Sequence, residues 1–312
     1  MTRAPAAPDP APPSAPDSIC IGAVLWDIVG RSASSMRVGS DVPGRITRLP
    51  GGVALNIAMA LQGFGLKTAL LSVVGRDAEG EELMARLADL GLITEFTYRS
   101  ADLPTDRYMA IEGANGLVAA IADAHSLEAA GSKILRALAD GRLGSETAPF
   151  EGIVALDGNL TLALLSECAT SPLLAQADLR VAPASPGKAE RLLPFLRRPR
   201  ATLYVNKEEA GILCKSEFDT SRQAARALVE RGASRAIVTD GGQDAADARS
   251  GDDPKGEIVR APPAVLVSRV TGAGDTFMAG HIAAEADGAS RDEALARALR
   301  AAAKYVSGGS PF

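Results

Sequence analysis

The feature that most constrains this chain of 312 residues is the alternation of short apolar strand patterns with helical patterns. Strand patterns at Ile19–Leu25 and Thr68–Val74 are separated by a helical pattern at Val53–Phe64. Most of the later predicted strands are also separated by helical runs, and they are Ile153–Leu156, Leu179–Val181, Thr202–Val205, Ala236–Thr239 and Glu257–Val259. Strands joined through helices favour a mostly parallel sheet with helices on both faces. The sequence therefore predicts an α/β fold.

Two segments interrupt this alternation. Residues 30–50 lack apolar periodicity, and residues 96–123 contain short alternating runs around Asn115–Gly116, a strong hairpin signal. We expect both segments to form a small β-rich lid over the strand ends of one domain that spans residues 18–312. Gln243–Gly256 is rich in Asp, Gly, Ser and Ala, and is predicted to be a flexible surface loop.

Composition argues against several classes of function. The net charge is −5, with acidic and basic residues interspersed, so binding to a nucleic-acid polymer is not expected. The three cysteines form no CxxC pair, which argues against a zinc site and a disulfide framework. Residues 1–17 are predicted to be a disordered tail and not a signal peptide, and no segment is apolar enough to span a membrane. We therefore expect a cytoplasmic protein.

The most specific segment surrounds Ala273, which Gly272 and Gly274 flank at the start of a helix predicted at about Ala273–Ala286. Unpaired backbone N–H groups at a helix start can bind phosphate, and small residues let it come close. Asp275 follows in the first turn, where it could accept the proton of an attacking hydroxyl group. The helix N-terminus should lower the basicity of this carboxylate. Taken alone, these residues also fit a simple turn followed by an acidic first helical turn.

A second group of candidate residues lies near the N-terminus. Asp27 follows the first predicted strand, and Gly51 and Gly52 precede the helical segment that carries Asn56. A Gly-Gly pair would let the backbone approach a substrate, an ionised carboxylate accepts hydrogen bonds from hydroxyl groups, and an amide can both donate and accept. The same residues are equally compatible with a hinge and a local helix cap.

Two further segments follow predicted strands. Asn206 and Glu209 open a helix, although Asn followed three residues later by Glu is also the pattern of a capping box. Thr239 and Gly241 lie at the end of the next strand. The sequence contains neither the P-loop pattern GxxxxGK[ST] nor the dinucleotide pattern GxGxxG, so both of those phosphate-binding motifs lack support.

These segments together resemble the ribokinase-like (PfkB) family of kinases. The resemblance covers nearly the whole chain from Ile19 and is carried by Thr271–Asp275, Gly51–Ala58 and Asn206–Glu209. It implies a ribokinase-like fold and the transfer of the γ-phosphoryl group of ATP to a sugar or nucleoside hydroxyl. The implied catalytic group consists of Asp275, Gly272, Ala273 and Gly274. The implied substrate residues are Asp27, Gly51, Gly52 and Asn56. The implied nucleotide residues are Asn206, Thr239, Gly241, Gly272 and Gly274, with Glu209 linked to Mg²⁺, largely through water.

Within the family, the segments Arg107–Ile111, Ala120–Asp123 and Asp157–Leu160 look most like those of pseudouridine kinases. This implies the 5′-hydroxyl of pseudouridine as the acceptor, with Thr105 and Asp123 reading the base and ribose. Asp123 is equally compatible with a solvated strand end. The alternatives are another sugar or nucleoside kinase, of the ribokinase, fructokinase or adenosine kinase type, and a non-catalytic nucleoside- or sugar-binding sensor.

Three positions depart from the family pattern. Arg269 stands where most relatives carry Asp, six residues before the catalytic one, which puts stimulation by a monovalent cation such as K⁺ in doubt. Ala182 replaces the Asp or Asn frequent at that strand end, and Asp244 stands where a second turn glycine is common. These two changes leave the substrate contacts and the nucleotide fit open. An exposed β lid could also pair with the lid of a second copy to form a homodimer.

Overall fold

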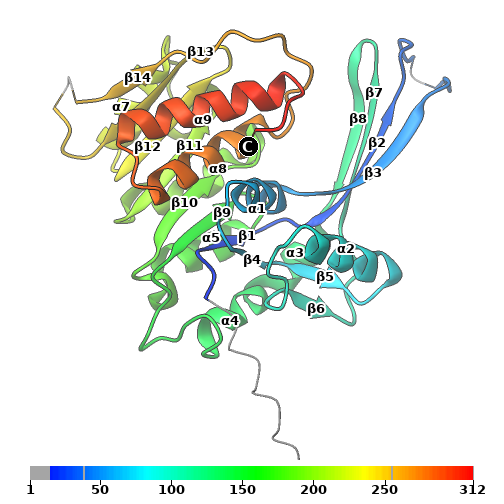
Figure 1. Cartoon of the computed structure of the whole chain (residues 1–312), viewed down its shortest axis with the longest axis horizontal. Helices are drawn as coiled ribbons and strands as arrows, with labels where there is room; N and C mark the ends of the chain where they lie inside the picture. The colour runs from blue at the N-terminus through cyan, green and yellow to red at the C-terminus, as the bar shows by residue number, and fades with distance from the viewer. Residues whose placement is uncertain (1–14, 38, 254–255, 312) are drawn as a thin grey trace, which may run out of the picture.

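The computed structural model describes residues 15–37, 39–253 and 256–311, and it confirms the predicted α/β fold (Figure 1). The tail predicted at residues 1–17 falls mostly outside these ranges. Asp17 already belongs to the fold, because its N–H donates to the Lys67 carbonyl at 2.9 Å. Among the helices in the described ranges, none has the length and apolar character needed to cross a membrane.

An eight-stranded sheet forms the body of the molecule, in the order β14-β13-β12-β11-β10-β9-β1-β4. Its strands are β1 (Ser18–Ile21), β4 (Thr68–Leu71), β9 (Ile153–Asp157), β10 (Asp178–Ala182), β11 (Ala201–Asn206), β12 (Arg235–Asp240), β13 (Gln243–Arg249) and β14 (Ile258–Arg260). Neighbouring strands from β4 to β12 are parallel, whereas β13 runs antiparallel to β12 and β14. The carboxyl ends of the parallel strands therefore meet at one edge of the sheet, where ligands bind in open α/β folds.

Helices cover both faces of this sheet, so side chains of one strand alternate between two apolar clusters. In β1, Ile19 and Ile21 pack into the first cluster and Cys20 into the second. The second cluster receives α1 (Val53–Gly63), α2 (Ala78–Asp89), α8 (Ala273–Ala286) and α9 (Arg291–Val306). The first receives α3 (His125–Ala130), η1 (Gly131–Leu135), α4 (Arg136–Ala139), α5 (Leu162–Thr170), η2 (Pro172–Leu174), η3 (Pro186–Arg197), α6 (Lys207–Cys214) and α7 (Ser221–Glu230).

A second, four-stranded sheet stands beside the body in Figure 1, in the order β3-β2-β7-β8. Its strands are β2 (Leu25–Arg31), β3 (Arg45–Gly51), β7 (Arg107–Gly113) and β8 (Gly116–Asp123). The predicted hairpin lies between β7 and β8, where Gly116 adopts φ +94° after the turn. The predicted lid segment 96–123 is only partly in this sheet. Its first part, residues 96–106, lies outside, because β6 (Tyr98–Ser100) pairs with β5 (Val73–Gly75) in a separate two-stranded sheet.

Two predicted strands are each divided in the structure. Ile19–Leu25 is interrupted after β1 by Gly22, which has φ +152° and lies so close to Asp157 that a Cβ would approach its Oδ2 to 2.3 Å. Thr68–Val74 is interrupted at Ser72, whose hydroxyl donates to the Gly22 carbonyl at 2.6 Å. As a result the chain leaves the main sheet after β1, and Asp27 lies within β2 of the second sheet.

The predicted flexible loop at Gln243–Gly256 is wrong in its first half, which forms β13. Asp247 in this strand is fully buried and pairs with Arg235 at 2.7 Å and with Arg291 at 3.1 Å. The alanines around it are buried as well, Ala246 and Ala248 among them. The polar composition was misleading because the arginines that neutralise Asp247 come from distant parts of the chain.

Candidate active site

Two segments that are far apart in the sequence meet at Asp275. Gly272 precedes α8 with φ +86°, Ala273 and Gly274 are its first residues, and Asp275 follows in the first turn. Asn56, in the first turn of α1, donates a hydrogen bond from Nδ2 to Asp275 Oδ2 at 2.9 Å. Helices α1 and α8 pack in the same apolar cluster, which holds these two side chains together. The candidate base and a candidate substrate residue therefore occupy one site.

The acidity of Asp275 differs from the expectation. Burial raises its pKa to about 7; the hydrogen bond from Asn56 lowers it, and the negative charges of Asp157 and Asp27 raise it further. Desolvation and repulsion between carboxylates thus outweigh the hydrogen bond from Asn56, and the pKa rises although a helix N-terminus favours the charged form. A carboxylate with a pKa near the working pH is well suited to accept a proton.

The backbone N–H groups at the start of α8 are not all available. The N–H of Ala273 donates to the Val270 carbonyl at 3.0 Å, so its expected part in an anion hole is not supported. In the part of the chain that the structure describes, the N–H groups of Gly272 and Gly274 have no intramolecular acceptor. Gly274 is exposed and has open space beside it. The flanking glycines, and not Ala273, are therefore the groups that could receive a phosphoryl oxygen.

Asp27 approaches the site from the second sheet. Its carboxylate lies directly against Gly51, where a Cβ would come within 2.0 Å of Oδ2. Gly52 has φ +102°, and a Cβ there would meet the Ala23 carbonyl oxygen at 2.4 Å. Both glycines are thus required by the close packing of this connection. Burial raises the pKa of Asp27 to about 6.

Strand register decides which side chains share a face with Asp27. Tyr108 of β7 pairs with Asp27 of β2, so both point to the same side. Burial raises the pKa of Tyr108, and the charge of Asp27 adds to this. Asp123 is aligned with Arg107, one position earlier, and so lies on the opposite face, where its Oδ1 is 2.8 Å from His125 Nδ1. The structure does not bring Asp123 to Asp27, and Tyr108 is a candidate that the sequence pattern missed.

Thr105 also differs from its expected role. Its side chain is buried, and its hydroxyl donates to Asp77 Oδ1 at 2.6 Å. The N–H of Thr105 donates to the other carboxylate oxygen of Asp77 at 2.8 Å. Asp77 is the N-cap of α2, so Thr105 anchors the start of that helix, and its position does not support a substrate contact.

Asp157 fixes the connections around the site. It ends β9, is fully buried, and accepts hydrogen bonds at 2.8 Å from the N–H groups of Ala23 and Ala54 and at 2.7 Å from that of Asn159. Ala54 lies in the first turn of α1, so this carboxylate sets the position of that helix. Asp157 is also the register partner of Ala182 on β10. The resemblance implies an Asp or Asn at position 182, at the end of β10. In this chain the carboxylate at this part of the sheet edge is that of Asp157, at the end of β9.

The predicted nucleotide residues lie at the ends of β11 and β12. Asn206 and Thr239 are register partners, and Gly241, with φ +57°, forms the turn to β13 with Gly242. The side chain of Asn206 accepts the Glu209 N–H at 2.8 Å, and Glu209 Oε2 accepts the Asn206 N–H at 2.8 Å. The capping box is therefore present, and it holds both side chains in fixed positions at the sheet edge.

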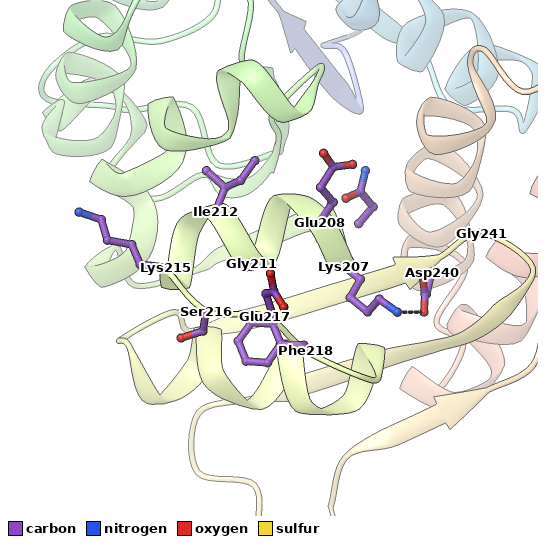
Figure 2. A pocket seen from close by; sticks show the side chains of 11 residues that line it. Lys207, Glu208, Gly211, Ile212, Lys215, Ser216, Glu217, Phe218, Asp240 and Gly241 are labelled. Atoms are coloured by element: carbon purple, nitrogen blue, oxygen red, sulfur yellow. Dashed lines mark ion pairs between the residues drawn. The ribbon is translucent and has the colours of Figure 1, made fainter.

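A pocket of about 880 Å³ opens beside these strand ends (Figure 2). It is lined by Asn206, Asp240 and Gly241 and, along α6 and the loop that follows it, by residues that include Lys207 and Phe218. An ion pair of 2.7 Å between Lys207 and Asp240 links α6 to the turn. Asp275 does not line this pocket. The pocket thus extends the predicted nucleotide region along α6.

Comparison with known proteins identifies the family. The sequence profile of the pfkB family of carbohydrate kinases matches residues 15–311. The chain belongs to the pfkB family. Members of this family are phosphotransferases that act on hydroxyl groups, and this protein is a kinase of that class.

Individual relatives differ in substrate. The chain is 28% identical over 276 residues to the pseudouridine kinase of Escherichia coli (strain K12), covering 86% of this chain and 84% of that protein. It is 27% identical over 275 residues to the ribokinase of Mus musculus, covering 83% and 79%. The Arabidopsis thaliana ribokinase complexed with ribose and ATP superposes with a TM-score of 0.78 at 21% identity, covering 95% of both chains. This last comparison shows that the ribokinase-like fold is shared.

Replacing Asp275 should stop the chemistry and leave binding in place. We expect Asp275→Asn to lower kcat by about 10²- to 10⁴-fold, because an amide of the same shape cannot accept the hydroxyl proton. Release of ADP measures turnover, and calorimetry measures the affinity for each ligand. Asp89→Asn, at the exposed end of α2, is the matched control. Unchanged turnover in Asp275→Asn would refute its role as the base.

The pH dependence of turnover should report the pKa of Asp275. Because burial raises that pKa to about 7, kcat/KM should fall as the pH drops below about 7 and the carboxylate becomes protonated. The hydrogen bond from Asn56 favours the charged form, so Asn56→Ala should move this acidic limb to higher pH. Profiles of kcat/KM against pH test this, with Asn115→Ala in the β7–β8 turn as the control. An acidic limb that stays in place in Asn56→Ala contradicts the prediction.

Proposed function

We propose that this kinase uses ATP and Mg²⁺ to phosphorylate the 5′-hydroxyl of pseudouridine. The observation that carries the chemistry is the 2.9 Å hydrogen bond between Asn56 and Asp275, which joins the N-terminal and C-terminal signature segments in one site. The substrate assignment is supported by the similarity to the E. coli pseudouridine kinase over most of both chains. It is also supported by the related segments around Arg107–Ile111 and Asp157–Leu160.

In the proposed reaction, Asp275 orients the acceptor hydroxyl and takes its proton while the phosphoryl group is transferred. The N–H groups of Gly272 and Gly274 donate to the oxygens of that phosphoryl group, where negative charge must be stabilised. Asn56, Asp27 and Tyr108 hold the nucleoside, because an amide, a carboxylate and a phenol together can bind neighbouring hydroxyl groups and a polar base edge. This positioning supplies a large part of the rate enhancement.

The nucleotide is assigned to the ends of β11 and β12, where Asn206, Thr239 and Gly241 line the sheet edge. Within the described ranges, no group of three or more His, Cys, Asp and Glu side chains could hold a metal ion. Mg²⁺ fits such a site through one carboxylate, because it usually keeps several waters and binds the phosphates of the nucleotide. Glu209 is that carboxylate, and the bound ion would neutralise charge on the phosphates.

The second sheet is assigned the role of a lid. It carries Asp27 and Tyr108 on one face, and it is joined to the body through the connection at Gly22 and through Gly51–Gly52. Movement of this sheet toward the body would enclose the acceptor. Enclosure excludes water and so limits the hydrolysis of ATP in the absence of an acceptor.

Two alternatives differ from this proposal in what they predict. The similarity to the mouse ribokinase is almost as high as that to the pseudouridine kinase, so a sugar acceptor such as ribose is the second candidate function. A non-catalytic sensor with the same fold would bind a nucleoside or sugar without transferring phosphate. The joint presence of Asp275, Asn206 and Glu209 favours catalysis, because a sensor needs no base and no metal-linked residue.

An acceptor panel tests the proposed function. ADP release from Mg-ATP is measured with pseudouridine, uridine, adenosine, ribose and fructose, and without an acceptor. We expect strong release with pseudouridine, and weak release without an acceptor because the lid excludes water. Release only with another acceptor keeps the kinase chemistry and overturns the substrate assignment. Binding without any release favours the sensor.

We further propose that the lid pairs with the lid of a second copy. The face of the second sheet opposite Asp27 carries exposed apolar side chains, Ile46 (79% exposed) and Ile121 (69%) foremost, together with Met109 and Ile111. Met109 and Ile121 are register partners, and Ile46 and Ile111 are the register partners of Gly30 on its two sides. Water-exposed apolar surface of this kind is typical of an interaction site, and an identical face on a second copy would cover it.

A charged residue on this face should separate such a dimer. We expect Ile121→Asp to yield monomers, because the carboxylate would be buried in the interface without a partner. Light scattering after size-exclusion chromatography measures the mass of each variant. Leu162→Asp, at the exposed start of α5, is the control. A wild-type protein that is monomeric at assay concentration contradicts the proposed dimer.

A further inference from the structure

The C-terminal end of α9 is fastened to the segment that precedes the catalytic helix. The N–H of Arg269 donates to the Val306 carbonyl at 3.1 Å, and its Nε donates to the Tyr305 carbonyl at 2.9 Å. A longer contact of 3.4 Å joins Nη2 to the Gly309 carbonyl. The guanidinium carbon lies 3.7 Å from the centre of the Tyr305 ring. One cationic side chain thus contacts two carbonyl oxygens and an aromatic face.

These partners are groups that stabilise a cation. Carbonyl oxygens at a helix C-terminus carry partial negative charge, and an aromatic face attracts a positive charge. Among the residues that the structure describes, no carboxylate forms an ion pair with Arg269. The charge of Arg269 is therefore held by neutral groups at the end of α9.

The same contacts reach the start of α8 through Tyr305. Its hydroxyl donates to the Thr271 carbonyl at 2.9 Å, and it lies so close to Gly272 that a Cβ there would come within 2.6 Å of the hydroxyl oxygen. Gly272 carries one of the N–H groups assigned to the phosphoryl oxygens, and Asp275 follows one turn later. The stack of Arg269 on Tyr305 therefore sets the backbone that presents both groups.

A monovalent cation does not fit beside this arrangement. The family resemblance implies stimulation by such an ion, and it implies a carboxylate at position 269. In this chain the position has the opposite charge, and the guanidinium already occupies the carbonyl oxygens of Tyr305 and Gly309. A second cation at these oxygens would be repelled at short range.

We propose that Arg269 is a built-in cation and a positioning residue that holds the start of α8 in its working geometry, so that turnover requires no monovalent cation. This inference rests on the proposed kinase function, because its consequence is read in phosphoryl transfer. The inference also concerns the geometry of the segment from Arg269 to Gly272 when no ligand is bound. That part can be tested without an acceptor.

The first experiment uses the wild-type protein in KCl, NaCl and choline chloride at equal ionic strength, with Mg-ATP and an accepted substrate. We expect equal kcat and equal thermal stability in the three salts. Activation of the wild type by K⁺ over choline overturns the proposal. This series needs no variant, so it decides the question even if substitutions at position 269 fold poorly.

The second experiment removes the built-in charge. Arg269→Ala should lose about 10- to 100-fold in kcat, because the misplaced start of α8 costs catalytic geometry. Added guanidinium or K⁺ should restore part of this loss, whereas the wild type should not respond. A merely structural role would give lower stability without rescue. Arg260→Ala, which removes an exposed arginine paired with Asp292, is the matched control and should behave as the wild type.

The third experiment separates this proposal from the proposed function. Thermal unfolding of Arg269→Asp without ligands should show stabilisation by K⁺ over choline, because the carboxylate now leaves the carbonyl oxygens open to an ion. The wild type should show no such difference. If no acceptor is phosphorylated, the proposed function fails, and this measurement still decides the role of Arg269. Identical salt responses of Arg269→Asp and the wild type would overturn the proposal.

Discussion

The buried carboxylate of Asp157 holds together the chain segments that build the site. It accepts hydrogen bonds from the N–H groups of Ala23, Ala54 and Asn159, which belong to the β1–β2 connection, to the start of α1 and to the residues after β9. Each of these N–H groups would be buried without an acceptor if the carboxylate were absent, at a cost of about 1–3 kcal/mol for each. This interaction helps to fix the positions of Asp27 and Asn56, because each lies a few residues after a segment that Asp157 holds.

The same group of carboxylates gives the site its electrostatic character. Asp157, Asp27 and Asp275 are close enough for the negative charges of the first two to raise the pKa of the third, in addition to the effect of burial. A site with this much negative charge is unfavourable until a ligand brings compensating groups. Hydroxyl donors and Mg²⁺ carried by a nucleotide are ligands that relieve such repulsion. In the proposed function, substrate binding would therefore be linked to the protonation state of Asp275.

Positive charge acts on only part of this group of carboxylates: the charge of Lys188 opposes the rise in the pKa of Asp157, whereas no cation is among the causes that shift the pKa of Asp275. Arg269 contacts the end of α9, while the arginines near Glu285 and Asp247 are held within the body of the fold. Backbone N–H groups, and not side-chain cations, are the donors left at the start of α8. This separation keeps a cationic side chain from pairing with Asp275 and lowering its pKa.

Much of the fold could be predicted from the sequence because it depends on local patterns. The helix at Ala273–Ala286 has the predicted bounds, and the helix at Val53 ends within one residue of the predicted end, since helical periodicity and the glycine after the helix are read from neighbouring residues. The family signatures at Thr271–Asp275 and Gly51–Ala58 are also short runs of neighbouring residues. The family, the order of elements and the candidate base were therefore accessible from the sequence alone.

Tertiary structure decided what depends on contacts between distant residues. The break at Gly22 follows from the position of Asp157, and β13 exists because Arg235 and Arg291 neutralise Asp247. Strand register placed Tyr108 beside Asp27 and Asp123 on the other face, because a shift of one residue reverses the side to which a side chain points. The sequence by itself determined which chemical groups the site could use. Only the folded chain determined their partners, burial and pKa values, since these arise from groups that packing brings together across the whole length of the protein.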